Sequence, residues 1–175
     1  WVTGLYPHGH CQYINYTPKW EGIRGCSMAA GTATIGDVLK GEGYACAIAG
    51  VWHLADDYQP NHGFTDYWVK YSYHDLSLPD PHFAELEQLG LFNPYDPANG
   101  CIEQIGIFPY TDIADPRQQR TSWVVDRALE YLERPGLGEE EPFFLMVGIK
   151  DPHPPMAPPP DLLREYRPEA MPLPE

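Results

Sequence analysis

Two histidines that follow apolar runs are the residues best placed to do chemistry in this sequence. The run at residues 45–50 (ACAIAG) leads to His53, and the run at residues 142–149 (PFFLMVGI) leads to His153. An imidazole with a pKa near about 6.5 can act as an acid, a base or a cationic hydrogen-bond donor to an oxyanion. If both runs are parallel strands, the two rings leave the same edge of one sheet and can converge on one ligand. The alternative, that each ring only caps its strand through backbone hydrogen bonds, stays open.

The other polar candidates carry weaker signals. His8 and His10 form an HxH pair beside Cys11 that can in principle hold a transition metal, although imidazoles more often pack a loop through hydrogen bonds. The pair Asp56 and Asp57 suits a hard cation, but a surface turn is the commoner role for such a pair. No glycine-rich phosphate loop follows either apolar run, which disfavours a nucleotide-binding fold. The sequence identifies no partner for His62, His74 and His82.

Two helix–strand pairs must position the two histidines. Residues 34–44 predict a helix with Thr34 as its N-cap, and the uninterrupted apolar run at 45–50 follows as a buried strand. Residues 120–134 predict a second helix, and residues 142–149 a second buried strand. Such units predict an α/β fold with a mainly parallel sheet flanked by helices. The helix residues expected to face the core are Ile35, Val38, Leu39, Trp123, Val124, Ala128, Leu129, Tyr131 and Leu132.

The sequence between these pairs is rich in turn signals. Residues 67–69 predict a short strand, and Asp80 with Pro81 predicts the start of a short helix. An irregular stretch of this length inside a compact domain is usually functional or an insertion. Residues 70–115 are therefore predicted to form a loop-rich insertion.

Composition excludes some classes of protein. The 175 residues are 43% hydrophobic, which suits a globular domain. With 11 Lys and Arg against 25 Asp and Glu, the net charge is −14, so no nucleic-acid partner is expected. This acidity fits either simple solubility or a cation-dependent enzyme. No apolar run approaches the ~20 residues of a membrane span.

The cysteines and the chain ends limit the interpretation further. None of the four cysteines forms a CxxC pair, so a structural zinc site is disfavoured. Cys46 is predicted to be a small core residue, and a disulfide between Cys11 and Cys26 is left open. The chain starts at Trp1 without a signal-like segment and stops in a proline-rich stretch. Both features lead us to expect a fragment of a longer protein.

Five segments in chain order resemble motifs of the sulfatases, a branch of the alkaline-phosphatase superfamily. Residues 3–10 (TGLYPHGH) resemble the stretch that follows the sulfatase nucleophile, and residues 34–44 (TIGDVLKGEGY) resemble TLAExLKxxGYxT. Residues 50–54 (GVWHL) resemble GKWHLG, and residues 62–68 (HGFTDYW) are similar to the xGFDxF turn. Residues 142–155 (PFFLMVGIKDPHPP) resemble PFFLxxxxxxPHxPxxxP. Each match is weak alone, but the series spans nearly the whole chain.

The resemblance implies a sulfate-ester hydrolase with an alkaline-phosphatase-like catalytic domain, of which residues 1–175 would be an N-terminal part truncated at both ends. It also implies a formylglycine nucleophile and a divalent cation, usually Ca²⁺, that neutralises sulfate oxygens as a Lewis acid. By position, His53 would contact the sulfate or the nucleophile. His153 would bind the sulfate and protonate the leaving oxygen, which places donors where charge develops.

This sequence departs from the family pattern in three ways. The CxPSR nucleophile motif should lie before Trp1, and Cys11 is no substitute because no Pro-Ser-Arg follows it. The Asp pair and the Asp-Asn pair that hold the cation also fall outside the chain, so no metal ligand is expected within it. Val51 occupies the position of a lysine that would pair with the sulfate. Lys150 is a candidate substitute for that charge, with a surface or packing role as the alternative.

The parent protein is therefore expected to hydrolyse a sulfate ester or sulfamate, with a sulfated small molecule or glycan as substrate. The chain alone is expected to be inactive. Two alternatives stay open: a phosphonate or phosphodiester hydrolase of the same superfamily, and a non-catalytic sulfatase-like binding homologue. The resemblance favours a periplasmic or secreted location, while the oligomeric state stays open.

Overall fold

The fold is known from a computed structural model, which describes residues 2–13, 28–52, 61–69, 80–91, 115–153, 159–165 and 167–172. The chain divides into two compact units. The first consists of Trp1–Pro81 and Val124–Lys150, and the second of His82–Trp123 and Asp151–Glu175.

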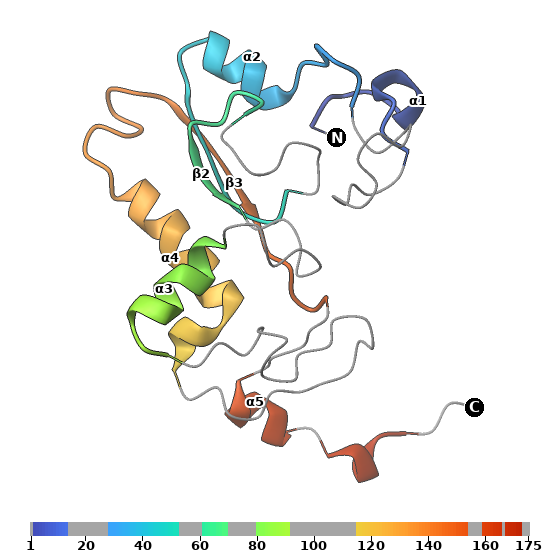
Figure 1. Cartoon of the computed structure of the whole chain (residues 1–175), viewed down its shortest axis with the longest axis vertical. Coiled ribbons are helices and arrows are strands. Elements are labelled where there is room, and N and C mark those ends of the chain that lie inside the picture. Colours follow the sequence, from blue (N-terminus) through green and yellow to red (C-terminus); the bar gives the residue numbers. More distant parts are fainter. Residues whose placement is uncertain are drawn as a thin grey trace. The chain divides into compact units, whose positions relative to one another are not determined.

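The first unit is built on a parallel sheet (Figure 1). Its strands are β1 (Ala45–Gly50), β2 (Asp66–Val69) and β3 (Phe143–Gly148), in the order β2-β1-β3. Both pairings of β1 are parallel, with Gly50 opposite Val69 on one side and Gly148 on the other. These strands confirm the α/β fold with a parallel sheet, including the short strand predicted at residues 67–69.

Helices cover both faces of this sheet. Since side chains alternate along β1, this strand contributes apolar residues to each face, and a helix packs against each set. Cys46 and Ile48 form a buried cluster with Phe64, against which Leu39 of α2 (Ile35–Gly41) packs. Ala45 and Ala47 point to the opposite face, where they form a cluster with Tyr131 of α4 (Arg120–Leu132). All six residues of β1 are buried, as expected for the central strand of a sheet covered on two sides.

Helix α2 begins where its sequence predicts. Thr34 is the N-cap: its side chain accepts a hydrogen bond from the Asp37 backbone N–H, while the Asp37 side chain accepts one from the Thr34 N–H. This reciprocal capping box satisfies two donors that a helix start otherwise leaves unpaired. The helix ends at Gly41, the first of the two glycines in the 34–44 segment that are expected to mark its end. The following Gly43, with φ of 86°, adopts a left-handed conformation that ends the helical path.

The predicted apolar faces are only partly buried within the described residues. Trp123, Val124, Ala128 and Tyr131 are buried, as expected. By contrast, Ile35, Val38, Leu129 and Leu132 are exposed. Strand β3 was predicted to be buried, but Phe143 and Val147 are exposed because β3 lies at the edge of the described sheet. Periodicity identifies which side of an element is apolar, whereas burial depends on what packs against it.

The second unit contains shorter elements. Helix α3 (Pro81–Gln88), whose first residue belongs to the first unit, confirms the predicted short helix, and the 3₁₀ turn η4 (Pro116–Gln118) precedes the start of α4. The segment after β3 continues to α5 (Pro160–Glu165) and the 3₁₀ turn η5 (Pro168–Ala170). The boundary between the units falls inside α4, after Trp123.

Several predicted features lie outside the described residues. Apart from α3 and its flanks, most of the proposed 70–115 insertion is among them. So are His53, His74 and the Asp56-Asp57 pair. Among the helices that the structure describes, none is long and apolar enough to cross a membrane.

Candidate active site

The two histidine-bearing segments start from a close contact between strand ends. Gly50 and Gly148 are opposite each other at the carboxyl ends of β1 and β3, and the Val51 N–H donates to the Gly148 carbonyl oxygen at 2.8 Å. A Cβ atom on Gly50 would overlap the Gly148 carbonyl, and one on Gly148 would overlap the Val51 carbonyl. Glycine at both positions therefore lets the two backbones approach where ligands bind in open α/β sheets.

The residue before His53, Trp52, is well packed. Trp52 is buried, and its ring lies edge-on to Phe64 with ring centroids 5.3 Å apart. The ring of His62 is also near, at 6.0 Å. The chain on both sides of residues 53–60 is thus anchored in the same core cluster, while His53 itself is outside the described residues.

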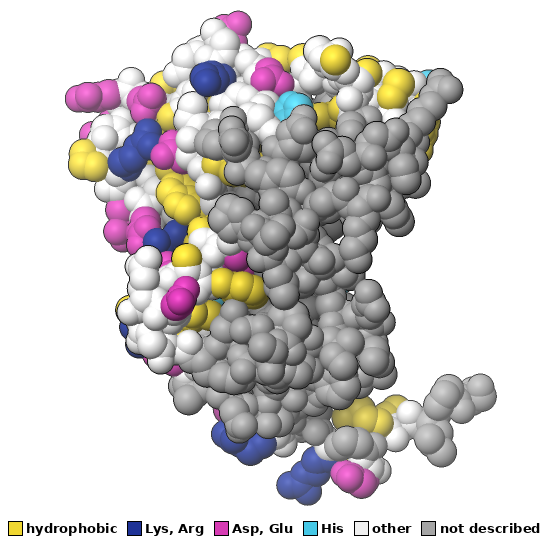
Figure 2. Space-filling view, in the orientation of Figure 1, with side chains coloured by type: hydrophobic (Ala, Val, Ile, Leu, Met, Phe, Trp, Pro, Cys, Tyr) yellow, Lys and Arg dark blue, Asp and Glu magenta, His cyan; other side chains and the backbone are white. Residues whose placement is uncertain are grey.

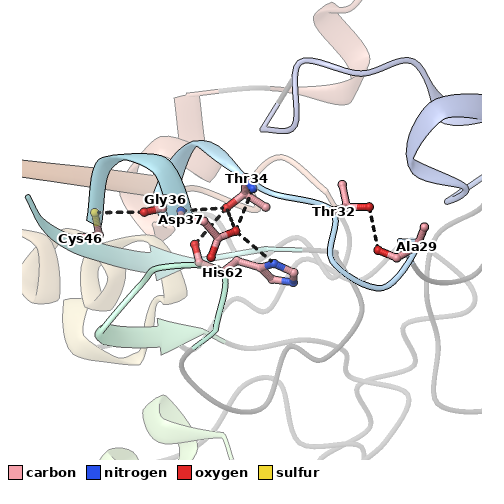
Figure 3. A network of polar contacts seen from close by, with 7 residues as sticks. All are labelled: Ala29, Thr32, Thr34, Gly36, Asp37, Cys46 and His62. Atoms are coloured by element: carbon pink, nitrogen blue, oxygen red, sulfur yellow. Dashed lines mark hydrogen bonds and ion pairs between the residues drawn. The ribbon is translucent and has the colours of Figure 1, made fainter. Parts of the chain in front are cut away.

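The turn at residues 62–64 is locked onto the start of α2 (Figure 3). The Thr34 hydroxyl lies 3.0 Å from the His62 carbonyl oxygen, to which it donates, and His62 Nδ1 lies 3.9 Å from the Asp37 carboxylate. Gly36 packs against this turn so closely that a Cβ on it would overlap the His62 carbonyl. Two of the motif segments, 34–44 and 62–68, are therefore joined by one hydrogen-bonded contact.

The segment that carries His153 follows β3 directly. Lys150 is half-buried and is the last residue of the first unit, whereas His153 is exposed in the second unit. The bond between Asp151 and Pro152 is cis. The Thr121 hydroxyl, in the first turn of α4, donates a hydrogen bond to the Asp151 carboxylate.

Position 51 supplies no charge to this edge of the sheet. Val51 is half-buried, and its N–H is used in the contact with Gly148. An apolar side chain here can pack but cannot pair with an anion. Any positive charge near this strand end must come from another residue, and Lys150 remains a candidate for it.

The histidines near the N-terminus have structural partners. His10 Nδ1 accepts a hydrogen bond from the Gln12 N–H at 3.2 Å, and His8 stacks on Tyr6 with ring centroids 5.8 Å apart. Both lie in α1 (Pro7–His10), a single helical turn that the sequence did not predict. Cys11 is exposed and has a free thiol in the structure, while Cys26, its candidate disulfide partner, lies outside the described residues.

No metal site emerges from the described part of the chain. In those residues, no three His, Cys, Asp or Glu side chains come together as ligands of one ion. The HxH pair of His8 and His10 therefore does not acquire a third ligand there.

Sequence reasoning missed the environment of His82. This histidine is fully buried, its Nε2 lies 2.8 Å from the Arg117 carbonyl oxygen, and its ring lies 5.4 Å from that of Trp123. It also missed the bond between Thr121 and Asp151. The partners are 35 and 30 residues apart in the chain, so no local pattern could have indicated either contact.

Perturbed pKa values occur away from the strand ends. The Arg117 guanidinium, which donates hydrogen bonds to Asp115, lowers the pKa of that carboxyl to about 2. Burial raises the pKa of Tyr131 to about 12 and also raises that of the Cys46 thiol. Around α2 and α4, the described basic side chains on the face in Figure 2 lie singly among acidic ones.

A comparison with protein families covers nearly the whole chain. The family model described as "Sulfatase" matches residues 2–175. The chain belongs to the sulfatase family. Among curated sulfatases, mouse arylsulfatase G is 28% identical over 157 residues, which take in 77% of this chain. The chain spans about 28% of the length of that relative.

Membership of the sulfatase family explains why the motif segments also meet in space. The 34–44 and 62–68 segments meet at the Thr34–His62 contact, and Gly50 of the 50–54 segment pairs with Gly148 of the 142–155 segment across adjacent parallel strands. The conclusion from sequence that several weak matches form one pattern is therefore confirmed. The roles of His53, His153 and Lys150 remain predictions.

Proposed function

We propose that the protein to which this chain belongs hydrolyses sulfate esters, with His53 and His153 as acid–base and sulfate-binding groups. The observation that supports this most directly is the Gly50–Gly148 contact between parallel strand ends. His53 follows Gly50 by three residues and His153 follows Gly148 by five. Both histidines thus follow strand ends that pair with each other, and we propose that each contacts the sulfate group.

Each imidazole has a role suited to the reaction. Cleavage of a sulfate ester builds negative charge on the leaving oxygen and redistributes it over the sulfate oxygens. His153 would donate a proton to the leaving oxygen, and His53 would donate a hydrogen bond to the sulfate or the nucleophile. Lys150 would add the positive charge that Val51 does not supply.

The sulfatase family also suggests a formylglycine nucleophile and a divalent cation, with Ca²⁺ the expected ion. Such a cation withdraws charge from sulfate oxygens when bound. The side chains that the structure describes do not fit a cation site, since no three potential ligands meet among them. We propose that both groups lie outside this chain, because the CxPSR motif and the Asp and Asp-Asn pairs that the family resemblance implies are not found in its sequence, and we assign no step on this chain to either.

The substrate we propose is a sulfated small molecule or glycan. The name of the relative, arylsulfatase G, is consistent with an aryl sulfate as a laboratory substrate. A periplasmic or secreted location fits such substrates, and we propose it for the parent protein.

The test is turnover of an aryl sulfate by the full-length protein and its histidine variants. His153→Ala and His53→Ala should each reduce kcat by about 10²-fold or more, because general acid–base catalysis contributes about 10²–10⁴-fold. His8→Ala removes an exposed imidazole from the same chain and serves as the matched control, with turnover near wild type. Unchanged rates in both site variants would show that the assignment is wrong.

A parallel assay separates this function from its alternatives. Faster hydrolysis of an aryl phosphodiester or phosphonate than of the aryl sulfate would identify a different hydrolase of the superfamily. Absence of turnover with all three substrates, together with retained binding of a sulfated ligand, would identify a non-catalytic homologue.

A further inference from the structure

The Thr121 hydroxyl donates to the Asp151 carboxylate, two residues before His153. We propose that Thr121 and Asp151 form a positioning pair that sets the location of the His153 imidazole. The proposal rests on the function proposed above, since it concerns how one of its acid–base groups is held. All three residues belong to the second unit of the chain.

Thr121 is suited to this role because the first turn of α4 is firmly held. The Trp123 indole N–H donates to the Glu85 carboxylate at 2.7 Å, which joins α4 to α3. The Arg120 guanidinium lies over the Phe83 ring, 5.0 Å from its centroid. Arg120 and Trp123 are both buried, so the residues on each side of Thr121 have little freedom to move.

A buried histidine extends this support to the turn before α4. His82 is fully buried beside the Trp123 ring, and its Nε2 lies 2.8 Å from the Arg117 carbonyl oxygen of η4. Since a carbonyl oxygen only accepts, Nε2 must carry the proton in this contact. The end of η4 and the start of α4 are thus both fixed against α3.

Only one residue separates Asp151 from His153, so holding Asp151 in place also restricts where His153 can lie. That residue is Pro152, whose ring restricts its φ angle and leaves the connection little freedom. Asp151 and His153 are exposed, so packing alone does not immobilise this segment. A hydrogen bond from a rigid helix can hold such an exposed segment, and with it the His153 ring, in one place.

The first experiment compares variants of the full-length protein at position 121. Thr121→Val keeps the shape of the side chain but removes the hydroxyl, and it should reduce kcat about tenfold or more with a smaller change in KM. Thr121→Ser restores the hydroxyl and should restore most of the rate. Ser122→Ala removes the neighbouring hydroxyl and serves as the matched control. A rate loss in Thr121→Ser equal to that in Thr121→Val would overturn the proposal.

A double-mutant cycle tests whether Thr121 acts through His153. In the His153→Ala background, Thr121→Val should cause no further loss, because the ring it positions is gone. The loss in Thr121→Val should also be greater for aryl sulfates with poor leaving groups, which depend most on proton donation. Equal losses in both backgrounds and for all leaving groups would show that Thr121 acts otherwise, and would contradict the proposal.

A measurement without substrate separates failure of this proposal from failure of the proposed function. The NMR signals of the His153 ring should shift in Thr121→Val and Asp151→Ala and stay in place in Ser122→Ala. If the wild type does not hydrolyse sulfate but these signals shift, the function is wrong and the positioning pair stands. If His153→Ala abolishes turnover while the ring signals do not respond to either variant, the positioning pair is wrong.

Discussion

The backbones of Gly63 and Gly36 pack directly against each other where the 62–64 turn contacts α2. Gly63 has φ of 84°, and a Cβ atom on it would overlap the Gly36 carbonyl and the Asp37 nitrogen. Gly43 has almost the same φ, 86°, but a Cβ there would meet nothing within 4 Å. The two positions thus share one conformational requirement and differ in the space around them.

This difference predicts unequal effects of alanine. Gly43→Ala should lower the free energy of unfolding by about 1–2 kcal/mol, the cost of a left-handed conformation. Gly63→Ala should cost about 1–3 kcal/mol more, since the backbone must also move to make room. Urea unfolding of the two variants measures both values, and equal losses would contradict the close contact with Gly36.

Tyr131 combines burial with a pKa raised to about 12, mainly because burial disfavours the phenolate. Its hydroxyl oxygen has no hydrogen-bond partner among the described residues. In the unfolded chain a tyrosine has a pKa of about 10. The stability that comes from keeping the phenol neutral is therefore complete below pH ~10 and is lost as the pH rises through about 12.

Removing the Tyr131 hydroxyl should reduce the loss of unfolding free energy at alkaline pH. Tyr131→Phe should be as stable as wild type or slightly more stable at pH 8, because no hydrogen bond is lost. Above pH ~10 the wild type should lose more stability than the variant. Urea unfolding between pH 8 and pH ~11.5 tests this, with Tyr6→Phe as a control on an exposed phenol. Parallel profiles for wild type and Tyr131→Phe would contradict the assignment.

At the scale of elements, the N-terminus of α2 carries more than a helix cap. Thr34 is buried, and besides its reciprocal bonds with Asp37 it reaches the His62 carbonyl (Figure 3). One side chain therefore starts the helix and also ties it to a turn 28 residues later. This turn brings the chain back to the sheet after the segment that contains His53.

Loss of this hydroxyl should destabilise the first unit more than a surface cap would. Thr34→Ala should cost about 2 kcal/mol, the upper end for N-caps, because the part-buried His62 carbonyl also loses its donor. Thr34→Ser keeps the hydroxyl and should cost much less. Urea unfolding measures both, and a Thr34→Ala loss no larger than that of Thr34→Ser would show that the contact with His62 contributes nothing.

At the scale of the whole molecule, the chain carries two proposed acid–base groups, His53 and His153, and no nucleophile motif is identified in its sequence. General acid–base catalysis contributes about 10²–10⁴-fold, whereas enzymes reach about 10⁶-fold or more. We therefore expect the 175-residue chain, purified alone, to show no turnover of an aryl sulfate. The full-length protein in the same assay is the positive control. Measurable turnover by the chain alone would contradict the view that essential groups lie outside it.

Local chemistry made much of the framework predictable. The N-cap at Thr34, the strand at 45–50 and the helix that starts at Arg120 depend on short-range patterns, and the structure contains all three. Burial was predicted less well. Leu129 has the apolar character expected of the core, yet it is exposed, because nothing in the described part of the chain covers it.

The sequence by itself determined the family, the helix–strand units and the position of each histidine after an apolar run. These follow from residue type and spacing along one stretch of chain. Only the tertiary structure decided that Gly50 and Gly148 meet, that Thr34 binds the His62 carbonyl, and that Thr121 binds Asp151. Each of these contacts joins residues about 30 or more positions apart, and the packing of whole elements decides which distant groups meet.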